Sequence, residues 1–238
     1  MKRGLRLIAS GALDDGSIEQ LADRLGVTSR HLRRLFTQHL GASPLAVAHT
    51  QRLHFAKRLI DQTNLPMAHV ATAAGYGSVR RFNDTFRRTY GRAPRELRRH
   101  SEDLFDSNSA LAVRLTYSKP FDWMAMLDFF AGRATPGVEQ IVDGAYLRTV
   151  TVNGQPGVIE CRHDARRESV SLLLHGIETE QIFDVVQRVR EVLDLDAPVG
   201  EIQSVIAADK KLGKLMRRFP GIRVPGAWDG FELTVRAI

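Results

Sequence analysis

The sequence predicts a multidomain protein in which an all-α domain precedes an α+β domain with an antiparallel sheet, and short helices follow. Three observations support this order. A helical pattern occurs twice within the first hundred residues, residues 111–175 alternate apolar and polar side chains as strands do, and the excess positive charge is confined to the first part. We therefore expect domains over 1–100, 111–196 and 197–238, with a polar linker over 101–110.

Charge divides the chain at the same place. Residues 1–100 carry 18 Lys and Arg against 7 Asp and Glu, whereas residues 101–238 carry 16 against 20. Of the 18 cations in the first part, 16 are arginine, which binds phosphate and guanine edges through paired hydrogen bonds. A domain this basic attracts polyanions, and duplex DNA or RNA is the usual partner. The alternative is a solvated surface rich in arginine because of codon preference.

The first copy of the helical pattern begins with a short amphipathic helix. Ser17 is placed to cap this helix and Gly26 to end it. After a tight turn, a second helix runs to about His39, with Leu32 and Phe36 on one apolar stripe. The pattern is a helix, a turn containing glycine, and a second helix.

A second copy follows about 50 residues later. Phe82 and Phe86 stand 50 places after Leu32 and Phe36, and a Gly-x-x-Pro segment closes both copies. One long helix over 44–62 is expected to join them. A helix-turn-helix unit places its second helix in the major groove of DNA, so the duplication predicts an all-α tandem helix-turn-helix domain.

The outward face of each second helix is the predicted DNA-binding surface. The candidate residues are Ser29, Arg30, Arg33, Arg34, Thr37, Ser78, Arg80, Arg81, Asn83 and Arg87. Ser29 and Ser78 stand where the two helices begin, where a serine either caps the helix or also donates to a phosphate. Asp84 lies on the same face. It either accepts from cytosine N4 or pairs with Arg80 or Arg88, and we favour the ion pair.

Residues 5–100 resemble the AraC-type DNA-binding domain. The run over 74–82, with the phenylalanine, glycine and proline that follow it, matches the C-terminal signature of that family. The residues around Arg80 are closer to the variant found in Ada-type alkylation-response regulators. The resemblance implies seven helices that bind two successive major-groove segments of double-stranded DNA. A monomer would suffice because it carries both reading helices, and RNA polymerase is a further candidate partner.

Past the linker, the pattern changes from helical spacing to strand alternation. We expect strands over 111–117, 138–142, 145–152, 158–162 and 169–175, and helices over 121–132, 178–193, 198–209 and 209–219. Glycine turns at 143–144, 153–154 and 155–157 are expected to separate the strands. Short turns of this kind favour an antiparallel sheet.

Residues 111–238 resemble the N-terminal domain of AlkA-type DNA-3-methyladenine glycosylases and the beginning of their helical domain. The matching stretches are 115–123, 137–139, 144–149, 157–160, 193–196 and 220–238. The order of the two resembling parts is that of fused regulator–glycosylase proteins. This resemblance implies a role in transcriptional control or DNA repair under alkylation stress.

No residue is assigned a catalytic, cofactor-binding or metal-binding role from the sequence. The helix-hairpin-helix clamp and catalytic aspartate of the AlkA family would lie beyond residue 238, and the zinc domain of Ada-type proteins would precede Lys2. We therefore expect a chain truncated at both ends. The one cysteine, Cys161, is interpreted as a half-buried strand residue. The basic run over 210–218 either touches DNA or is a solvated face, and we favour the solvated face.

The sequence therefore predicts a cytoplasmic, sequence-specific DNA-binding regulator with no membrane segment and no cofactor. The alternative is the N-terminal portion of a DNA-3-methyladenine glycosylase acting in base excision repair, an enzyme only if the gene continues. In that case a carboxylate would act on a base flipped out of the duplex.

Overall fold

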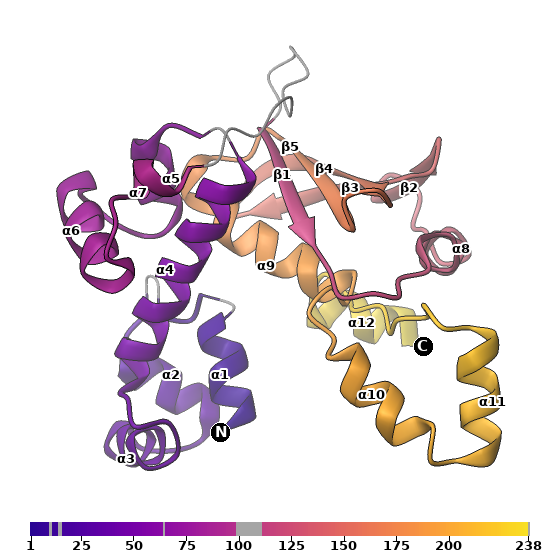
Figure 1. Ribbon diagram of the computed structural model, residues 1–238, viewed down its shortest axis with the longest axis horizontal. Coiled ribbons are helices and arrows are strands. Elements are labelled where there is room, and N and C mark those ends of the chain that lie inside the picture. Colours follow the sequence, from indigo (N-terminus) through magenta and orange to yellow (C-terminus); the bar gives the residue numbers. More distant parts are fainter. Residues whose placement is uncertain (10, 14–15, 64, 99–110, 238) are drawn as a thin grey trace. The chain divides into compact units, whose positions relative to one another are not determined.

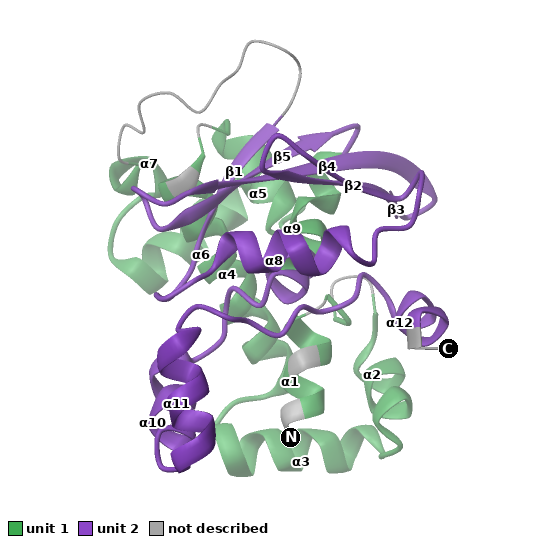
Figure 2. Cartoon of the chain, turned by 90° about the vertical axis from the view of Figure 1, so that its right-hand side faces the viewer, with its two compact units in different colours: residues 1–102, 178–187 green, residues 103–177, 188–238 purple. Residues whose placement is uncertain are grey.

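The chain forms two compact units in the computed structural model (Figures 1 and 2). The structure describes residues 1–9, 11–13, 16–63, 65–98 and 111–237. The first unit comprises 1–102 and 178–187, and the second comprises 103–177 and 188–238. The predicted linker over 101–110 lies outside the described residues.

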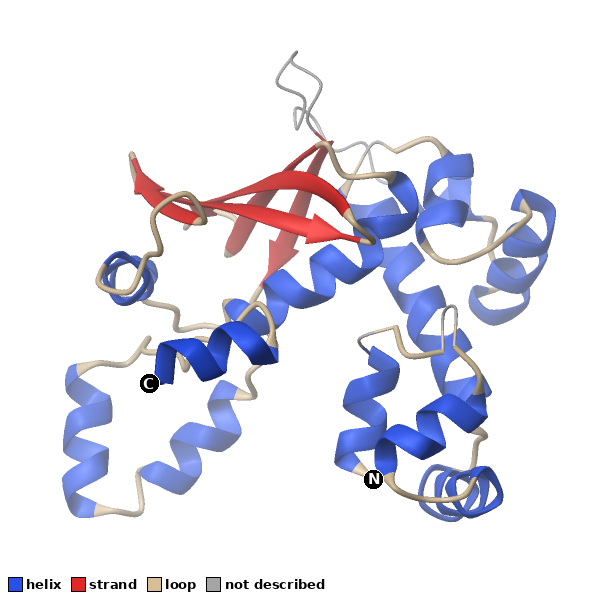
Figure 3. Cartoon of the chain, turned by 180° about the vertical axis from the view of Figure 1, so that it is seen from behind, coloured by secondary structure: helices blue, strands red, loops and turns tan. Residues whose placement is uncertain are grey.

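The first unit is helical (Figure 3). Its helices up to residue 98 are α1 (Lys2–Ala9), α2 (Ile18–Leu25), α3 (Ser29–Leu40), α4 (Pro44–Gln62), α5 (Met67–Ala73), α6 (Val79–Tyr90) and α7 (Pro94–Leu97). The described residues of this stretch therefore contain the seven helices that the AraC-type resemblance implies.

Local capping fixes both ends of α2. The Ser17 side chain accepts a hydrogen bond from the backbone N–H of Gln20, whose side chain accepts from the Ser17 N–H at 2.9 Å. Gly26 follows the helix with a φ of 70°, a left-handed conformation that glycine adopts without a steric penalty. The helix predicted between Ser17 and Gly26 is thus confirmed at both ends.

The apolar stripes of the two copies are buried. Leu32 and Phe36 of α3 join a core cluster with residues of α1, α2 and α4, and Phe82 and Phe86 of α6 are fully buried. The segment from 178 also belongs to this unit, where Phe183 meets Phe55 of α4 edge to face with ring centroids 4.7 Å apart. Burial of these large side chains supplies much of the driving force for folding.

The second unit is built on a five-stranded antiparallel sheet in the order β1-β5-β4-β3-β2. Its strands are β1 (Leu111–Thr116), β2 (Glu139–Val142), β3 (Ala145–Val152), β4 (Gln155–Asp164) and β5 (Ser169–His175). Its helices are α8 (Trp123–Ala131), α10 (Val199–Ile206), α11 (Lys210–Arg218) and α12 (Gly230–Ala237). The end of α9 (Ile182–Val192) also belongs to this unit, whereas the 3-10 turn η1 (Thr179–Gln181) and the beginning of α9 lie in the first unit. The predicted α+β class with an antiparallel sheet is confirmed.

Two boundary predictions in this part are wrong. The glycine turn expected over 155–157 lies inside β4, because Asn153-Gly154 already completes the reversal and Gln155 pairs with Val152. The helix expected over 178–193 begins as the 3-10 turn η1 and becomes α-helical only at Ile182.

One face of the sheet forms the core of the second unit. Cys161 of β4 is fully buried, rather than half-buried as predicted, and burial raises the pKa of its thiol. Trp123 is also buried, and its indole N–H donates to the Gly144 carbonyl at 2.9 Å.

In the part of the chain that the structure describes, no helix combines the length and apolar character needed to cross a bilayer.

Candidate nucleic-acid interface

The helices α3 and α6 begin and end in the same way. Thr28 caps α3 and Ser78 caps α6, and each side chain accepts from the backbone N–H three residues later, at 3.2 and 3.4 Å. Each helix has 12 residues and is followed by a left-handed glycine, Gly41 with φ 67° and Gly91 with φ 71°. The two helices therefore share one length and one register, and a position can be counted from the cap in both.

The capping interpretation of Ser29 is wrong. Thr28 has the extended backbone of an N-cap, with φ −78° and ψ 151°, and Ser29 is the first helical residue. The capping interpretation of Ser78 is confirmed. Ser29 stays half-buried at the beginning of α3, and Ser78 is exposed.

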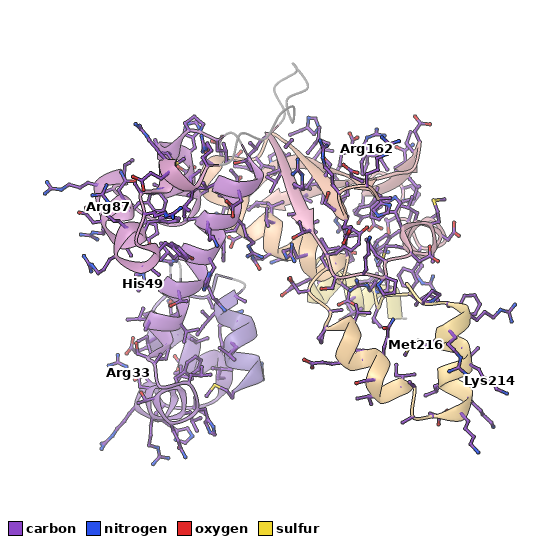
Figure 4. The ribbon with its side chains drawn as sticks, viewed as in Figure 1. Arg33, His49, Arg87, Arg162, Lys214 and Met216 are labelled. Atoms are coloured by element: carbon purple, nitrogen blue, oxygen red, sulfur yellow. The ribbon has the colours of Figure 1, made fainter. Side chains whose placement is uncertain are left out.

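The predicted face of each helix lies opposite its buried stripe. An α-helix turns roughly 100° per residue, so the residues two, six and nine places after the cap point in nearly one direction. These residues are Arg30, Arg34 and Thr37 in α3, and Arg80, Asp84 and Arg87 in α6. All six are exposed. Arg33 and Asn83, five places after the cap, and Arg81 are also exposed at the border of this face. Figure 4 labels Arg33 on α3 and Arg87 on α6.

Most of these side chains have no partner among the described residues. Arg33 approaches Glu19 at 3.7 Å, but both side chains are more than half exposed, so the pair is weak. Arg34 contacts the ring of His31 at 3.1 Å. Within the described ranges, Arg30, Arg80, Arg81 and Arg87 make no ion pair or hydrogen bond through their guanidinium groups. Their cationic heads are free to meet an anionic partner.

The ion pair predicted for Asp84 is also wrong. No Lys, Arg or His nitrogen in the described part of the chain lies within 4.0 Å of its carboxylate. Arg80 and Arg88, the expected partners, are exposed side chains that extend into solvent. A free carboxylate therefore stands among the arginines of α6.

The second unit contains a cluster of charges that is neutralised internally. Glu139 is buried and accepts from the hydroxyl of Tyr146 at 2.6 Å and from Arg148 at 2.8 Å. Arg148 also pairs with Glu232, and Arg236 pairs with Glu139. Burial acts to raise the pKa of Glu139, but the hydrogen bonds and the nearby guanidinium charges outweigh it and lower that pKa. The oxygens of this carboxylate are thus engaged by neighbouring side chains of the fold.

The remaining candidate groups carry no evident chemistry. The Cys161 thiol is inert because it is buried with a raised pKa. His163 contacts the Tyr117 hydroxyl at 2.7 Å and stacks on Trp123, and burial lowers the pKa of its ring. Within the described residues, no group of three His, Cys, Asp or Glu side chains is arranged to hold a metal ion.

The basic helix α11 separates its charges from its apolar residues. Its cations are Lys210, Lys211, Lys214, Arg217 and Arg218, all exposed. Met216 lines an apolar groove with residues of α10, and Figure 4 shows Lys214 on the other side of the helix. This arrangement is typical of a solvated face, and it is also compatible with a contact to DNA.

Sequence reasoning missed one helix cap and one buried cluster of charges. Thr28 was passed over as a cap, although a threonine directly before the helical pattern is a regular cap signal. The buried cluster around Glu139 joins residues that are up to 97 positions apart. Its one signal in the sequence is the alternation of side chains along β3. Tyr146 and Arg148 occupy the inward-facing positions of β3, where a charged residue requires a partner.

Two known domain families match successive parts of the chain. A helix-turn-helix domain model matches residues 21–100, and a model of the AlkA N-terminal domain matches residues 112–229. The protein is thus a helix-turn-helix protein with a second, α+β domain. More particularly, residues 21–100 form a helix-turn-helix domain of the AraC type, and residues 112–229 form an AlkA N-terminal domain.

Curated relatives match each part and the whole. A probable bifunctional transcriptional activator/DNA repair enzyme AlkA from Mycobacterium tuberculosis strain H37Rv is 37% identical over 240 residues, covering 99% of this chain and 48% of that protein. DNA-3-methyladenine glycosylase 2 of Escherichia coli K12 is 33% identical, with 52% of this chain and 42% of that protein covered. The HTH-type transcriptional regulator GlxA of Rhizobium meliloti strain 1021 is 38% identical, with 37% of this chain and 26% of that protein covered. The chain thus spans about half of the first relative and less of the other two.

Proposed function

We propose that this chain is a sequence-specific regulator of transcription that binds double-stranded DNA and acts in the response to DNA alkylation. The observation that carries the proposal is the matched pair α3 and α6. Each helix begins at a hydroxyl side chain that caps it and ends at a left-handed glycine, and each presents exposed arginines opposite its buried stripe. Two such helices suit two successive segments of a major groove.

The roles of the individual residues follow from their place along each helix. Residues near the start of a reading helix contact base edges, so Arg30, Arg34 and Arg80 are the proposed base readers. The remaining candidates are proposed to contact the DNA backbone: Ser29, Arg33, Thr37, Ser78, Arg81, Asn83 and Arg87. Backbone contacts fix the position of the protein on DNA, whereas base contacts give sequence preference.

The physical basis of binding has two parts. Each cation that neutralises a phosphate releases a counterion, which favours binding to any duplex and weakens with salt. Arginine can also donate two hydrogen bonds to O6 and N7 of guanine, which distinguishes one base from another. A monomer holds both reading helices and is the proposed binding species. The proposed setting is the cytoplasm, with RNA polymerase as a further partner.

A second candidate function is the front part of a DNA-3-methyladenine glycosylase. The match of residues 112–229 to the AlkA N-terminal domain favours it, as do the names of two of the relatives. Base excision requires a carboxylate beside the glycosidic carbon and a pocket for the flipped base. An assay for release of 3-methyladenine from alkylated DNA, on this chain and on the full product of the gene, would test it.

Selection from a random duplex pool, followed by sequencing and repeated over a salt series, tests the regulator. We expect an enriched site with two conserved segments roughly one helical turn, about 10 bp, apart. Binding that depends on salt alone, with no enriched sequence, would contradict the proposal. The arginines would then serve as a nonspecific anchor.

A further inference from the structure

We propose that Asp84 reads the amino group of a cytosine in the second DNA segment, so that the two reading helices recognise different bases at one shared position. The inference rests on the proposed function, because it requires α6 to enter a major groove. It concerns which base is read, and it can fail while the proposed function stands.

Arg34 and Asp84 occupy the same place in two equivalent helices. Each lies six residues after its N-cap, in a helix of 12 residues that ends at a left-handed glycine. The buried residues four and eight places after the cap, Leu32 with Phe36 and their counterparts in α6, fix the rotation of both helices about their axes. A base met by Arg34 in the first segment therefore has its counterpart opposite Asp84 in the second.

No contact within the described part of the fold accounts for Asp84. Its side chain is exposed, and among the described residues it has no ion pair or hydrogen bond. It lies beyond the first turn of α6, where a carboxylate no longer gains from the helix dipole. Aspartate is also a poor residue for a helix interior. A negative charge between Arg80 and Arg87 opposes phosphate binding, so a role in nonspecific attraction is excluded as well.

The chemistry of the carboxylate selects the base. An ionised carboxylate only accepts hydrogen bonds, so it is repelled by the O6 and N7 acceptors of guanine and the O4 of thymine. Cytosine presents the N4 amino group to the major groove without an adjacent N7 acceptor. Adenine presents an amino group beside N7, which would face the second carboxylate oxygen. Cytosine is thus the base that suits Asp84 best.

The test compares base preferences selected by the intact chain and by Asp84→Asn. Asparagine both donates and accepts, and its paired contact with adenine N6 and N7 should replace the contact with cytosine. We expect one position of the second segment to change from cytosine to adenine, with a roughly ten-fold reversal in relative affinity, as one correct base contact would give. Asp84→Ala should lose the preference without gaining another.

Two matched variants separate charge from recognition. Asp23→Asn removes the same charge from an exposed residue of α2, outside the two reading helices, and should leave every base preference unchanged. Arg34→Ala should relax the first segment only. Unchanged thermal unfolding of Asp84→Asn would confirm that the variant is folded, as its exposed position predicts.

The outcomes separate the inference from the function on which it rests. If the wild-type chain selects two segments and Asp84→Asn selects the same bases, the role of Asp84 is refuted and the regulator stands. The same holds if Asp84→Asn and Asp23→Asn raise affinity for all sequences alike, because Asp84 would then only adjust charge. If the wild-type chain selects no sequence, both proposals fail. A change from cytosine to adenine confined to the second segment supports both.

Discussion

The two units of this chain use arginine in opposite ways. On α3 and α6 the arginines are exposed, and most have no partner among the described residues. In the second unit Arg148, Arg190 and Arg223 are buried, and each is bound by carboxylates or carbonyls. Arg190, for example, bonds Asp196 at 2.9 Å and the Thr116 carbonyl at 3.2 Å. The same residue type is thus available to a ligand in one unit and committed to the fold in the other.

This difference has a simple electrostatic cause. A buried guanidinium must be paired and hydrogen-bonded, since an isolated charge in the interior is very costly. A surface guanidinium needs no partner and keeps its hydration until a phosphate or base replaces it. The number of arginines therefore says little about DNA binding. The number left without a carboxylate is the informative quantity, and it is reflected in the charge balance of each half.

The largest expected effect is the loss of stability when a buried arginine is replaced. Replacement of Arg148 by Ala would leave Glu139 buried with one of its cations removed, and should cost about 3–5 kcal/mol in the free energy of unfolding. Urea denaturation of the full chain would measure this loss of stability in the second unit. Arg162→Ala is the matched control in the same sheet, because Arg162 is half exposed and its pair with Glu160 should contribute at most about 1 kcal/mol. Equal losses would contradict the distinction between buried and exposed arginine.

The next largest effect is the loss of DNA affinity when an exposed arginine is replaced. Arg34→Ala should leave the free energy of unfolding within about 0.5 kcal/mol, because it is a surface substitution. It should weaken binding to the selected site by about 1–3 kcal/mol, the value of one paired contact to guanine. Binding to a random duplex should fall less. An equal loss on both duplexes, measured by fluorescence anisotropy, would show that Arg34 contacts only phosphate.

The sequence predicts local features well and distant contacts poorly. The stripe of Leu32 and Phe36, the ends of α2 and the strand over 145–152 all follow from neighbours within a few residues, and the structure agrees. The cluster of Glu139 and Arg236 depends on residues far apart in the chain. No periodicity shows which two distant charges will meet, so the tertiary structure is needed to identify them.

The predicted ion pair of Asp84 failed for a related reason. An i,i+4 spacing permits Arg80 or Arg88 to approach, but such a pair on an exposed helix is worth only about 0.2–0.5 kcal/mol. Both side chains instead remain in solvent. Spacing therefore indicates which pairs are possible on a helix, while the small energies involved leave the outcome to the surroundings.

A smaller effect is expected when the pH falls. The pKa of Glu139 is lower in the folded chain than in the unfolded chain, where it is about 4.3. Its contribution to stability is therefore fully present above that value and is lost as the pH falls through the folded pKa. We expect the difference in unfolding free energy between the wild type and Glu139→Gln to shrink in acid. A difference that stays constant between pH 7 and pH 3 would contradict the lowered pKa.

The smallest effect compares the two caps. Thr28→Ala and Ser78→Ala each remove one side-chain acceptor at the start of a reading helix, and each should cost about 1 kcal/mol in the free energy of unfolding. Ser29→Ala should change it by less than about 0.5 kcal/mol, because Ser29 is not the cap. Urea denaturation of the three variants side by side distinguishes these cases. If Ser29→Ala were the costlier substitution in α3, positions counted from the caps of α3 and α6 would no longer be equivalent. Arg34 and Asp84 would then not occupy corresponding positions.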